Sequence, residues 1–173
     1  MKKVRFVFLR VLKCSKVLMY IIYMKAVAVF THKIKGYVLF KQKDDHVLVS
    51  IELSGLKKNK AHGFHIHEFG DLRNDCISTG GHLNPFSKNH GGRDDDKRHV
   101  GDLGNIISDD KGKATFSFKD PMISLKNNKR NIIGRAIVIH KGEDDCGKGG
   151  HDDSLTTGHA GGRLDCAVIG ICK

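Results

Sequence analysis

The sequence contains no tryptophan, and aromatic residues make up only 7% of it. Proteins that bind single-stranded nucleic acid stack bases on aromatic side chains beside basic ones, and no basic run here is interleaved with aromatics. The formal net charge of +11 is unevenly distributed, because six of the 30 Lys and Arg residues lie in residues 1–23, which hold no Asp or Glu. Residues 24–173 hold 24 basic and 19 acidic residues, a balance of +5. We therefore expect no nucleic-acid partner for the main part of the chain.

Long apolar runs are missing as well. The longest, residues 17–24, is much shorter than the ~20 residues that a membrane-spanning helix needs. A secretory signal would follow this run with small residues, which Tyr20 to Met24 do not supply. We therefore expect no membrane span and treat residues 1–23 as an extension of uncertain status, either untranslated or disordered. Two alternatives remain open for it: a signal that directs secretion, or a basic module that binds nucleic acid or a membrane.

The five cysteines include no closely spaced pair; they are Cys14, Cys76, Cys146, Cys166 and Cys172. Thiolate zinc sites need cysteines a few residues apart, and small secreted modules carry a dense disulfide framework. The sequence therefore argues against both, and a metal site would rest on nitrogen and oxygen ligands.

Histidine supplies such ligands, and two of them stand at alternate positions in the segment His62 to Gly70. Side chains alternate between the faces of an extended strand, so His65 and His67 project from the same side and make half a metal site. His62 is an odd number of positions from both and is expected to face the other way. We do not count it as a ligand.

Five further candidate ligands follow in glycine-rich and polar segments: His82, His90, His99, Asp102 and His140. Seven nitrogen and oxygen ligands suffice for two metal centres, and imidazole suits zinc, copper, iron or nickel. The alternative for any single histidine is an ordinary surface or core role. The compact spacing of His90, His99 and Asp102 disfavours that alternative for the array as a whole.

Short apolar and β-branched runs dominate the chain from Lys25 onwards, and no window predicts a convincing amphipathic helix. Turn residues separate these runs, which favours an all-β antiparallel sandwich or barrel. The runs are Ala26 to Phe30, Tyr37 to Phe40, Val47 to Leu53, Phe64 to Ile66, Ala114 to Phe118, Ile132 to Ile139 and Ala167 to Ile171. Two long segments, Gly70 to Gly104 and Lys141 to Gly162, do not fit the strand pattern. Because each holds or borders candidate ligands, we expect two functional loops.

Several segments together resemble the copper-zinc superoxide dismutase family, from about Lys25 to Ile171 and in the order that this family shows. They are Gly63 to Asp71, Asn84 to Gly92, Arg98 to Asn105, Gly147 to Gly150 and Cys166 to Ile171. The resemblance implies an eight-stranded Greek-key fold and the dismutation of superoxide to dioxygen and hydrogen peroxide. It implies one copper and one zinc ion per subunit, a homodimer and a copper chaperone as a partner. The alternative is a noncatalytic copper- and zinc-binding or metal-delivery protein on the same fold.

The start of the family's mature domain resembles Met24 to Val29. This resemblance implies that translation begins at Met24, that the domain comprises residues 24–173, and that the product is cytoplasmic. Pairing of subunits is expected through three segments: Phe69 to Asp71, Ile132 to Gly134 and Ile169 to Ile171.

The resemblance also assigns roles to individual residues. The copper ligands would be His65, His67, His82 and His140, and the zinc ligands would be His82, His90, His99 and Asp102. Catalysis would depend on Arg163, which attracts and docks superoxide, and on His82, which bridges the metals and transfers a proton. Asp144 would orient one histidine of each site, Thr157 would narrow the channel, and Cys76 would form a disulfide with Cys166. Gly142 and Thr156 stand where the family often has lysines, which predicts weaker attraction of the anion.

Overall fold

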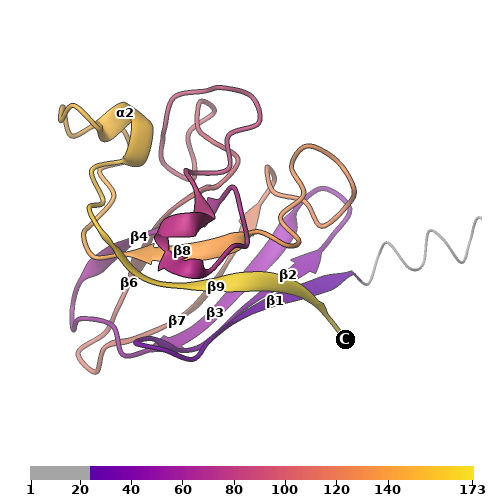
Figure 1. Ribbon diagram of the computed structural model, residues 1–173, viewed down its shortest axis with the longest axis horizontal. Coiled ribbons are helices and arrows are strands. Elements are labelled where there is room, and N and C mark those ends of the chain that lie inside the picture. Colours follow the sequence, from indigo (N-terminus) through magenta and orange to yellow (C-terminus); the bar gives the residue numbers. More distant parts are fainter. Residues whose placement is uncertain (1–23) are drawn as a thin grey trace, which may run out of the picture.

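The computed structural model describes residues 24–173, so the expected extension of residues 1–23 lies outside the described residues. Eight antiparallel strands form one sheet in the order β6-β4-β8-β9-β1-β2-β3-β7 (Figure 1). The prediction of an all-β, eight-stranded antiparallel fold is confirmed. The strands are β1 Lys25–Phe30, β2 Lys35–Gln42, β3 Val47–Ser54, β4 Ala61–His67, β6 Asp102–Ile107, β7 Lys113–Asp120, β8 Ala136–His140 and β9 Arg163–Cys172.

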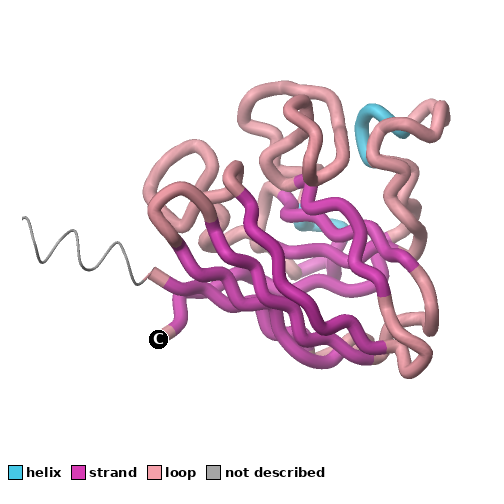
Figure 2. The backbone as a smooth tube through the Cα atoms, turned by 180° about the vertical axis from the view of Figure 1, so that it is seen from behind, coloured by secondary structure: helices cyan, strands magenta, loops and turns pink. Residues whose placement is uncertain are grey.

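The sheet curls into a nearly closed barrel, because its two end strands are consecutive in the chain and a short connection keeps them close together. β6 and β7 are joined by a short turn, yet they are the first and last strands of the sheet order. Figure 2 shows the curled sheet from behind, with the strands in magenta. Backbone hydrogen bonds fix this turn to the β3–β4 connection, with Leu56 N 3.1 Å from Gly112 O and Asn59 N 3.0 Å from Asp109 O. The connections β3 to β4 and β7 to β8 pass between the two halves of the sheet, as in a Greek key.

The core follows the alternation of side chains along the strands. In β3, residues Val47, Val49, Ile51 and Leu53 are buried, and the residues between them are more exposed. The predicted alternation in β7 is confirmed, since Ala114 is buried while Phe116 and Phe118 pack against the core cluster. Removal of this apolar surface from water is what drives the sheet to curl around a single interior.

Two strand predictions differ from the structure. The run from Ile132 to Ile139 is a strand only from Ala136, because Gly134 has a φ of +79° and Ile132 lies in the preceding loop, although it is fully buried. The predicted loop from Gly70 to Gly104 includes the first three residues of β6, Asp102 to Gly104. The pairing of β6 with β4, in which Ala61 opposes Ile107, outweighs the low strand propensity of these residues.

The two segments expected to be functional loops, Gly70 to Gly104 and Lys141 to Gly162, correspond to the connections at residues 68–101 and 141–162, which stand on the same side of the strands in Figure 1. Loop 68–101 contains the short strand β5 Arg73–Cys76 and the 3₁₀ helix η1 Ile77–Thr79, and loop 141–162 contains the short helix α2 Ser154–Thr157. The loops contact each other, because His90 N donates to Leu155 O at 2.8 Å and Lys148 Nζ lies 3.0 Å from a carboxylate oxygen of Asp95. Across residues 24–173, no helix has the length and apolar character required to cross a membrane.

Candidate metal centre

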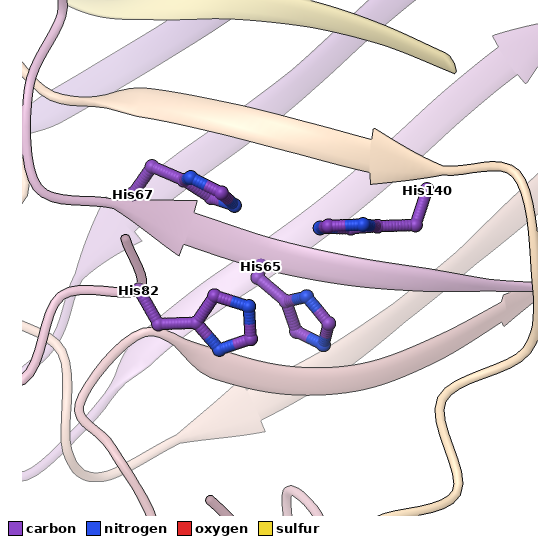
Figure 3. Close-up of side chains that lie close together, drawn as sticks. All are labelled: His65, His67, His82 and His140. Carbon is purple, nitrogen blue, oxygen red and sulfur yellow. The ribbon is translucent and has the colours of Figure 1, made fainter. Parts of the chain in front are cut away.

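Four imidazoles gather beside β4 and offer nitrogen atoms that lie within 4.8 Å of one another. Their close arrangement is shown in Figure 3; His65 and His67 come from β4, and His140 comes from the end of β8. His82 follows η1 in the chain, and an isolated β-bridge to His67 places it beside β4. The predicted pair on one strand is therefore completed by two distant histidines.

Each of three rings has one nitrogen held by an acceptor. His65 Nε2 donates to Asp144 Oδ2 at 2.7 Å, His67 Nδ1 to the carbonyl oxygen of Gly80 at 2.9 Å, and His140 Nδ1 to that of Gly161 at 3.0 Å. Because carbonyl and carboxylate oxygens accept hydrogen bonds, the proton sits on the held nitrogen and the other nitrogen keeps a lone pair.

The second nitrogen of each of these three rings and one nitrogen of His82 are buried and have no hydrogen-bond partner within residues 24–173. They are His65 Nδ1, His67 Nε2, His82 Nε2 and His140 Nε2. Buried polar atoms without a partner are rare in folded proteins, and here four such lone pairs face a common space. This is the arrangement that a metal ion bound by imidazoles requires, with the second nitrogen of each ring fixed by a hydrogen bond.

A second group surrounds Asp102, whose Oδ1 lies 2.8 Å from His82 Nδ1 and 3.1 Å from both His90 Nδ1 and His99 Nδ1. The other carboxylate oxygen accepts from His99 N at 2.8 Å and from Gly91 N at 3.2 Å, which fixes the orientation of Asp102. Three imidazoles and one carboxylate, all converging on one point, fit a tetrahedral zinc site.

His82 belongs to both groups. Its Nδ1 points to Asp102, and its buried Nε2 is one of the four unpartnered nitrogens of the first group. The two nitrogens of one ring thus face two separate sets of ligands.

Asp144 connects the groups through its two oxygens, since Oδ2 accepts from His65 Nε2 at 2.7 Å and Oδ1 from His90 Nε2 at 2.8 Å. Asn105 fixes its backbone with a reciprocal pair of 2.8 Å hydrogen bonds to the amide and carbonyl of Asp144. Gly158 leaves room for the carboxylate, because an added Cβ would lie 2.0 Å from Asp144 Oδ1. Sequence reasoning missed Asn105, and no local pattern marks it.

Burial keeps the imidazoles of the first group neutral. It lowers the pKa of His65 to about 3, of His67 to about 2 and of His140 to about 4. Burial also opposes charge on Asp102, but hydrogen bonds from its histidine partners outweigh this and hold its pKa below the ordinary value. For His90 burial is likewise outweighed, and its two carboxylate partners raise its pKa to about 9. Neutral imidazole and ionised carboxylate are the forms that bind metal, so the first group and Asp102 are already in the binding form, whereas His90 would release a proton on binding.

Arg163 stands at the start of β9, close to the first group. Its guanidinium donates to the carbonyl oxygens of Cys76, of Ile77 at 2.9 Å and of Gly80 at 2.6 Å. The carbonyl of Gly80 also holds His67, so the cation and a metal-facing imidazole share one acceptor. A cavity of about 730 Å³ lies beside Arg163 and is lined in addition by Lys33.

The disulfide between Cys76 and Cys166 is present, with a Cα–Cα distance of 5.7 Å, which confirms the predicted pairing. Thr157 ends α2, and its exposed hydroxyl donates to Asp153 Oδ2 at 3.2 Å. Its role in narrowing a channel stays a prediction. His62 is in neither ligand group; its Nδ1 lies 2.8 Å from the carbonyl oxygen of His140.

Comparison with known proteins gives a consistent result. Residues 34–169 match the family described as copper/zinc superoxide dismutase (SODC). The superoxide dismutase [Cu-Zn] of Paramecium bursaria Chlorella virus 1 is 54% identical over 148 residues, which cover 86% of this chain and 79% of the relative. Superoxide dismutase [Cu-Zn] A of Xenopus laevis is 56% identical over 140 residues, 80% of this chain and 91% of the relative.

Among solved structures, the crystal structure of the clock protein EA4 matches with a TM-score of 0.83 and 46% identity, covering 87% of this chain and 96% of that one. The residues that match the family, 34–169, include both ligand groups. The chain therefore belongs to the copper/zinc superoxide dismutase family.

Proposed function

We propose that this protein dismutates superoxide, converting two superoxide anions and two protons into dioxygen and hydrogen peroxide. Copper would be held by the first ligand group, His65, His67, His82 and His140, and zinc by the second, His82, His90, His99 and Asp102. The observation that carries this proposal is His82, whose Nδ1 belongs to one group while its unpartnered Nε2 belongs to the other.

The donor atoms support this division of the metals. Four imidazole nitrogens suit copper, which when bound supplies a one-electron redox couple. Three imidazoles with one carboxylate suit zinc, which has no accessible redox change and so serves structure. The zinc set is enclosed, since Asp102 is fully buried and its carboxylate is fixed by backbone amides.

The chain itself contributes an anion-docking cation. Arg163 is permanently charged, and the carbonyls of Ile77 and Gly80 aim its guanidinium, which leaves little conformational freedom to lose on binding. Its charge contributes to the lowered pKa of both His67 and His140, which supports an electrostatic influence of Arg163 on this group. We assign to it the attraction and orientation of superoxide. Thr157 would limit the size of the anion that enters.

A proton carrier is needed because the peroxide product leaves as hydrogen peroxide. His82 Nε2 is suited to this role, since it carries a lone pair and is buried beside the other three imidazoles. The opposite nitrogen, Nδ1, faces Asp102 and the zinc group, which would keep the ring in place while Nε2 accepts and returns the proton. A noncatalytic metal-binding or delivery protein is not favoured, because such a protein has no need of a positioned anion-docking arginine.

Subunit pairing is a further part of the proposal. Phe69, Val168 and Ile171 are large apolar side chains that are 51%, 39% and 71% exposed, and Gly70 packs closely enough that an added Cβ would lie 3.2 Å from Val168 Cγ1. Exposed apolar groups that cluster in this way mark interaction surfaces. We propose a homodimer through this patch, which light scattering of the purified protein would test.

The proposal also includes a cytoplasmic product that starts at Met24 and receives copper from a chaperone. Sequencing of the natural N-terminus tests the start, and recovery of peptides that contain Met1 would contradict it. Copper content measured after expression with and without a co-expressed chaperone tests the delivery.

The main test is metal analysis of the purified protein together with a dismutation assay before and after addition of copper. We expect one copper and one zinc per chain, activity that depends on copper, and loss of that activity in His140→Ala. Dismutation that survives in His140→Ala, or that is absent from a sample replete in both metals, would refute the proposed function.

A further inference from the structure

Two exposed histidines flank helix α2, and neither belongs to the two ligand groups. His151 precedes the helix, which runs from Ser154 to Thr157, and His159 follows it. The helix lies at the outer part of loop 141–162, away from the strands (Figure 1). The imidazole rings of His151 and His159 stack face to face, with centroids 3.7 Å apart and an interplanar angle of 15°.

Asp153 fixes the orientation of one of these rings. Its Oδ1 lies 2.7 Å from His159 Nδ1, and a carboxylate can only accept, so Nδ1 carries the proton and Nε2 keeps a lone pair. The same hydrogen bond is the main cause of the lowered pKa of Asp153, which keeps the carboxylate ionised. Histidines that bind a metal through one nitrogen commonly donate the other to a carboxylate in this way.

The spacing of the stacked rings suits one shared ion. Zinc–imidazole bonds are about 2.0–2.1 Å long, so two nitrogens on the same ion lie at most about 4.2 Å apart. The stacking distance of 3.7 Å is within that span. The ring of His151 is exposed and has no hydrogen-bond partner within residues 24–173, so it can turn a nitrogen toward the ion. Water would complete the coordination at this exposed position.

An ion held by both rings would join the two ends of α2. Gly158, between the helix and His159, fits closely against residues of the linked ligand groups, since an added Cβ would lie 2.0 Å from Asp144 Oδ1 and 2.4 Å from His90 Nε2. A metal ion shared by His151 and His159 would therefore restrain the loop at the point where it packs against Asp144.

We infer that His151 and His159 form a third metal site, for a divalent transition-metal ion such as zinc, in which Asp153 orients His159 and the ion fastens the loop around α2. With two imidazoles the site is weaker than the two groups that offer four ligands each, and it empties on dialysis while they keep their ions. The inference does not depend on which reaction the protein catalyses.

The test is a zinc titration of the full chain with both ligand groups already filled. Zinc is the probe because nitrogen ligands bind copper(II) more tightly, so added zinc does not displace copper. Isothermal titration calorimetry gives the number and affinity of the added ions. Hydrogen exchange of the Thr157 and Gly158 amides, which donate to Asp153 O at 2.8 Å and Ser154 O at 3.2 Å, reports on the helix.

Four variants separate the parts of the inference. His151→Asn and His159→Asn each remove one imidazole, and asparagine tolerates the φ of +51° at residue 159. Asp153→Ala removes the carboxylate that orients His159. His46→Asn is the matched control, because His46 Nδ1 lies 2.6 Å from Asp45 Oδ1, yet no second imidazole stacks on it within residues 24–173.

We expect the wild-type chain to bind a further zinc ion with a dissociation constant below about 1 mM. Each of His151→Asn, His159→Asn and Asp153→Ala should weaken this binding by about 10-fold or more, whereas Asp153→Asn, which keeps an acceptor oxygen, should retain it. His46→Asn should leave the affinity within about twofold of wild type. At free zinc about ten times the dissociation constant, exchange of the two amides should slow about 10-fold.

The inference is overturned if the wild-type chain takes up no further zinc, if either histidine variant keeps the ion, or if His46→Asn loses it as well. Zinc binding that leaves the exchange of Thr157 and Gly158 unchanged would refute the fastening of the loop. A protein that binds the further ion but does not dismutate superoxide would refute the proposed function and leave this inference intact.

Discussion

Replacement of Asp144 by asparagine tests how the two ligand groups are connected. The carboxylate is 2% exposed and accepts three hydrogen bonds, from His65 Nε2 at 2.7 Å, His90 Nε2 at 2.8 Å and Cys146 N at 2.7 Å. Asparagine keeps one acceptor oxygen and turns an NH₂ group, which cannot accept, toward one of the two imidazole N–H groups. One ring therefore loses its orienting partner in a buried place.

The expected magnitude follows from that loss. A hydrogen bond to a charged group contributes about 1.5–3 kcal/mol, and a buried donor left unsatisfied costs a similar amount. Since about 1.4 kcal/mol corresponds to a factor of ten, we expect zinc affinity to fall about 10- to 100-fold. Copper affinity should fall less, because His67 and His140 keep their own backbone acceptors, Gly80 and Gly161.

The assay is competition with a zinc chelator, followed by metal analysis after dialysis. Asp145→Asn is the matched control: its neighbouring carboxylate bonds to Gly147 N at 2.8 Å and to the hydroxyl of Ser154, and to none of the ligand histidines. A zinc affinity for Asp144→Asn equal to that of Asp145→Asn would refute the reasoning, since the hydrogen bonds to the imidazoles would then contribute nothing.

Three further predictions concern stability and substrate. Cys166→Ser removes a disulfide that spans 90 residues, which should lower the free energy of unfolding by about 4 to 5 kcal/mol on the chain-entropy model. Calorimetry should then show a melting temperature lower by roughly 10 to 15 °C, whereas Cys172→Ser, at a free cysteine, should change it little. Arg163→Gln should lower kcat/KM by about 10-fold or more at unchanged metal content, and should flatten its dependence on salt in stopped-flow assays. The metal-free protein should lose stability as pH falls below about 6.5. Burial lowers the pKa of His65 to about 3 and of His67 to about 2, so these histidines take up protons in the unfolded chain at a higher pH than in the folded protein, and acid favours the unfolded chain. Each such group contributes up to about 1.4 kcal/mol per pH unit between pH 6 and 4, and urea unfolding that is flat across this range would contradict the prediction.

Periodicity carried much of the fold prediction. Alternation of apolar residues identified β3 and β7, and the same rule placed His65 and His67 on one strand as a ligand pair. Both features depend only on which face a side chain takes, which the position along a strand determines. The disulfide between Cys76 and Cys166 and the division of the further ligands between two metals came instead from resemblance to a family, since spacing alone does not say which loops meet.

Where local composition and long-range pairing disagree, the sequence misled. Asp102 to Asn105 has the composition of a loop, and Gly104 has a φ of +73°, yet these residues belong to β6. Pairing with β4 determines that these residues form a strand, since Gly63 opposes Asn105 and His65 opposes Asp102 across the two strands. Such cross-strand partners are far apart in the chain, so no window of neighbouring residues contains them.

The least predictable part of the site is the set of groups that choose which nitrogen of each ring faces the metal. For His67 the deciding group is the carbonyl of Gly80, and a backbone carbonyl leaves no mark in the side-chain pattern. The same oxygen accepts from Arg163, so its position sets both the tautomer of a ligand and the aim of the docking cation. Gly80 has a φ of +76°, which strains any larger residue, and an added Cβ would lie 2.9 Å from Phe69 Cδ2, so either the Phe69 side chain or the backbone would have to shift. Since a backbone shift at Gly80 would move the acceptor of His67 and of Arg163 together, the proposed metal binding and the proposed anion docking would be coupled through a residue that has no side chain.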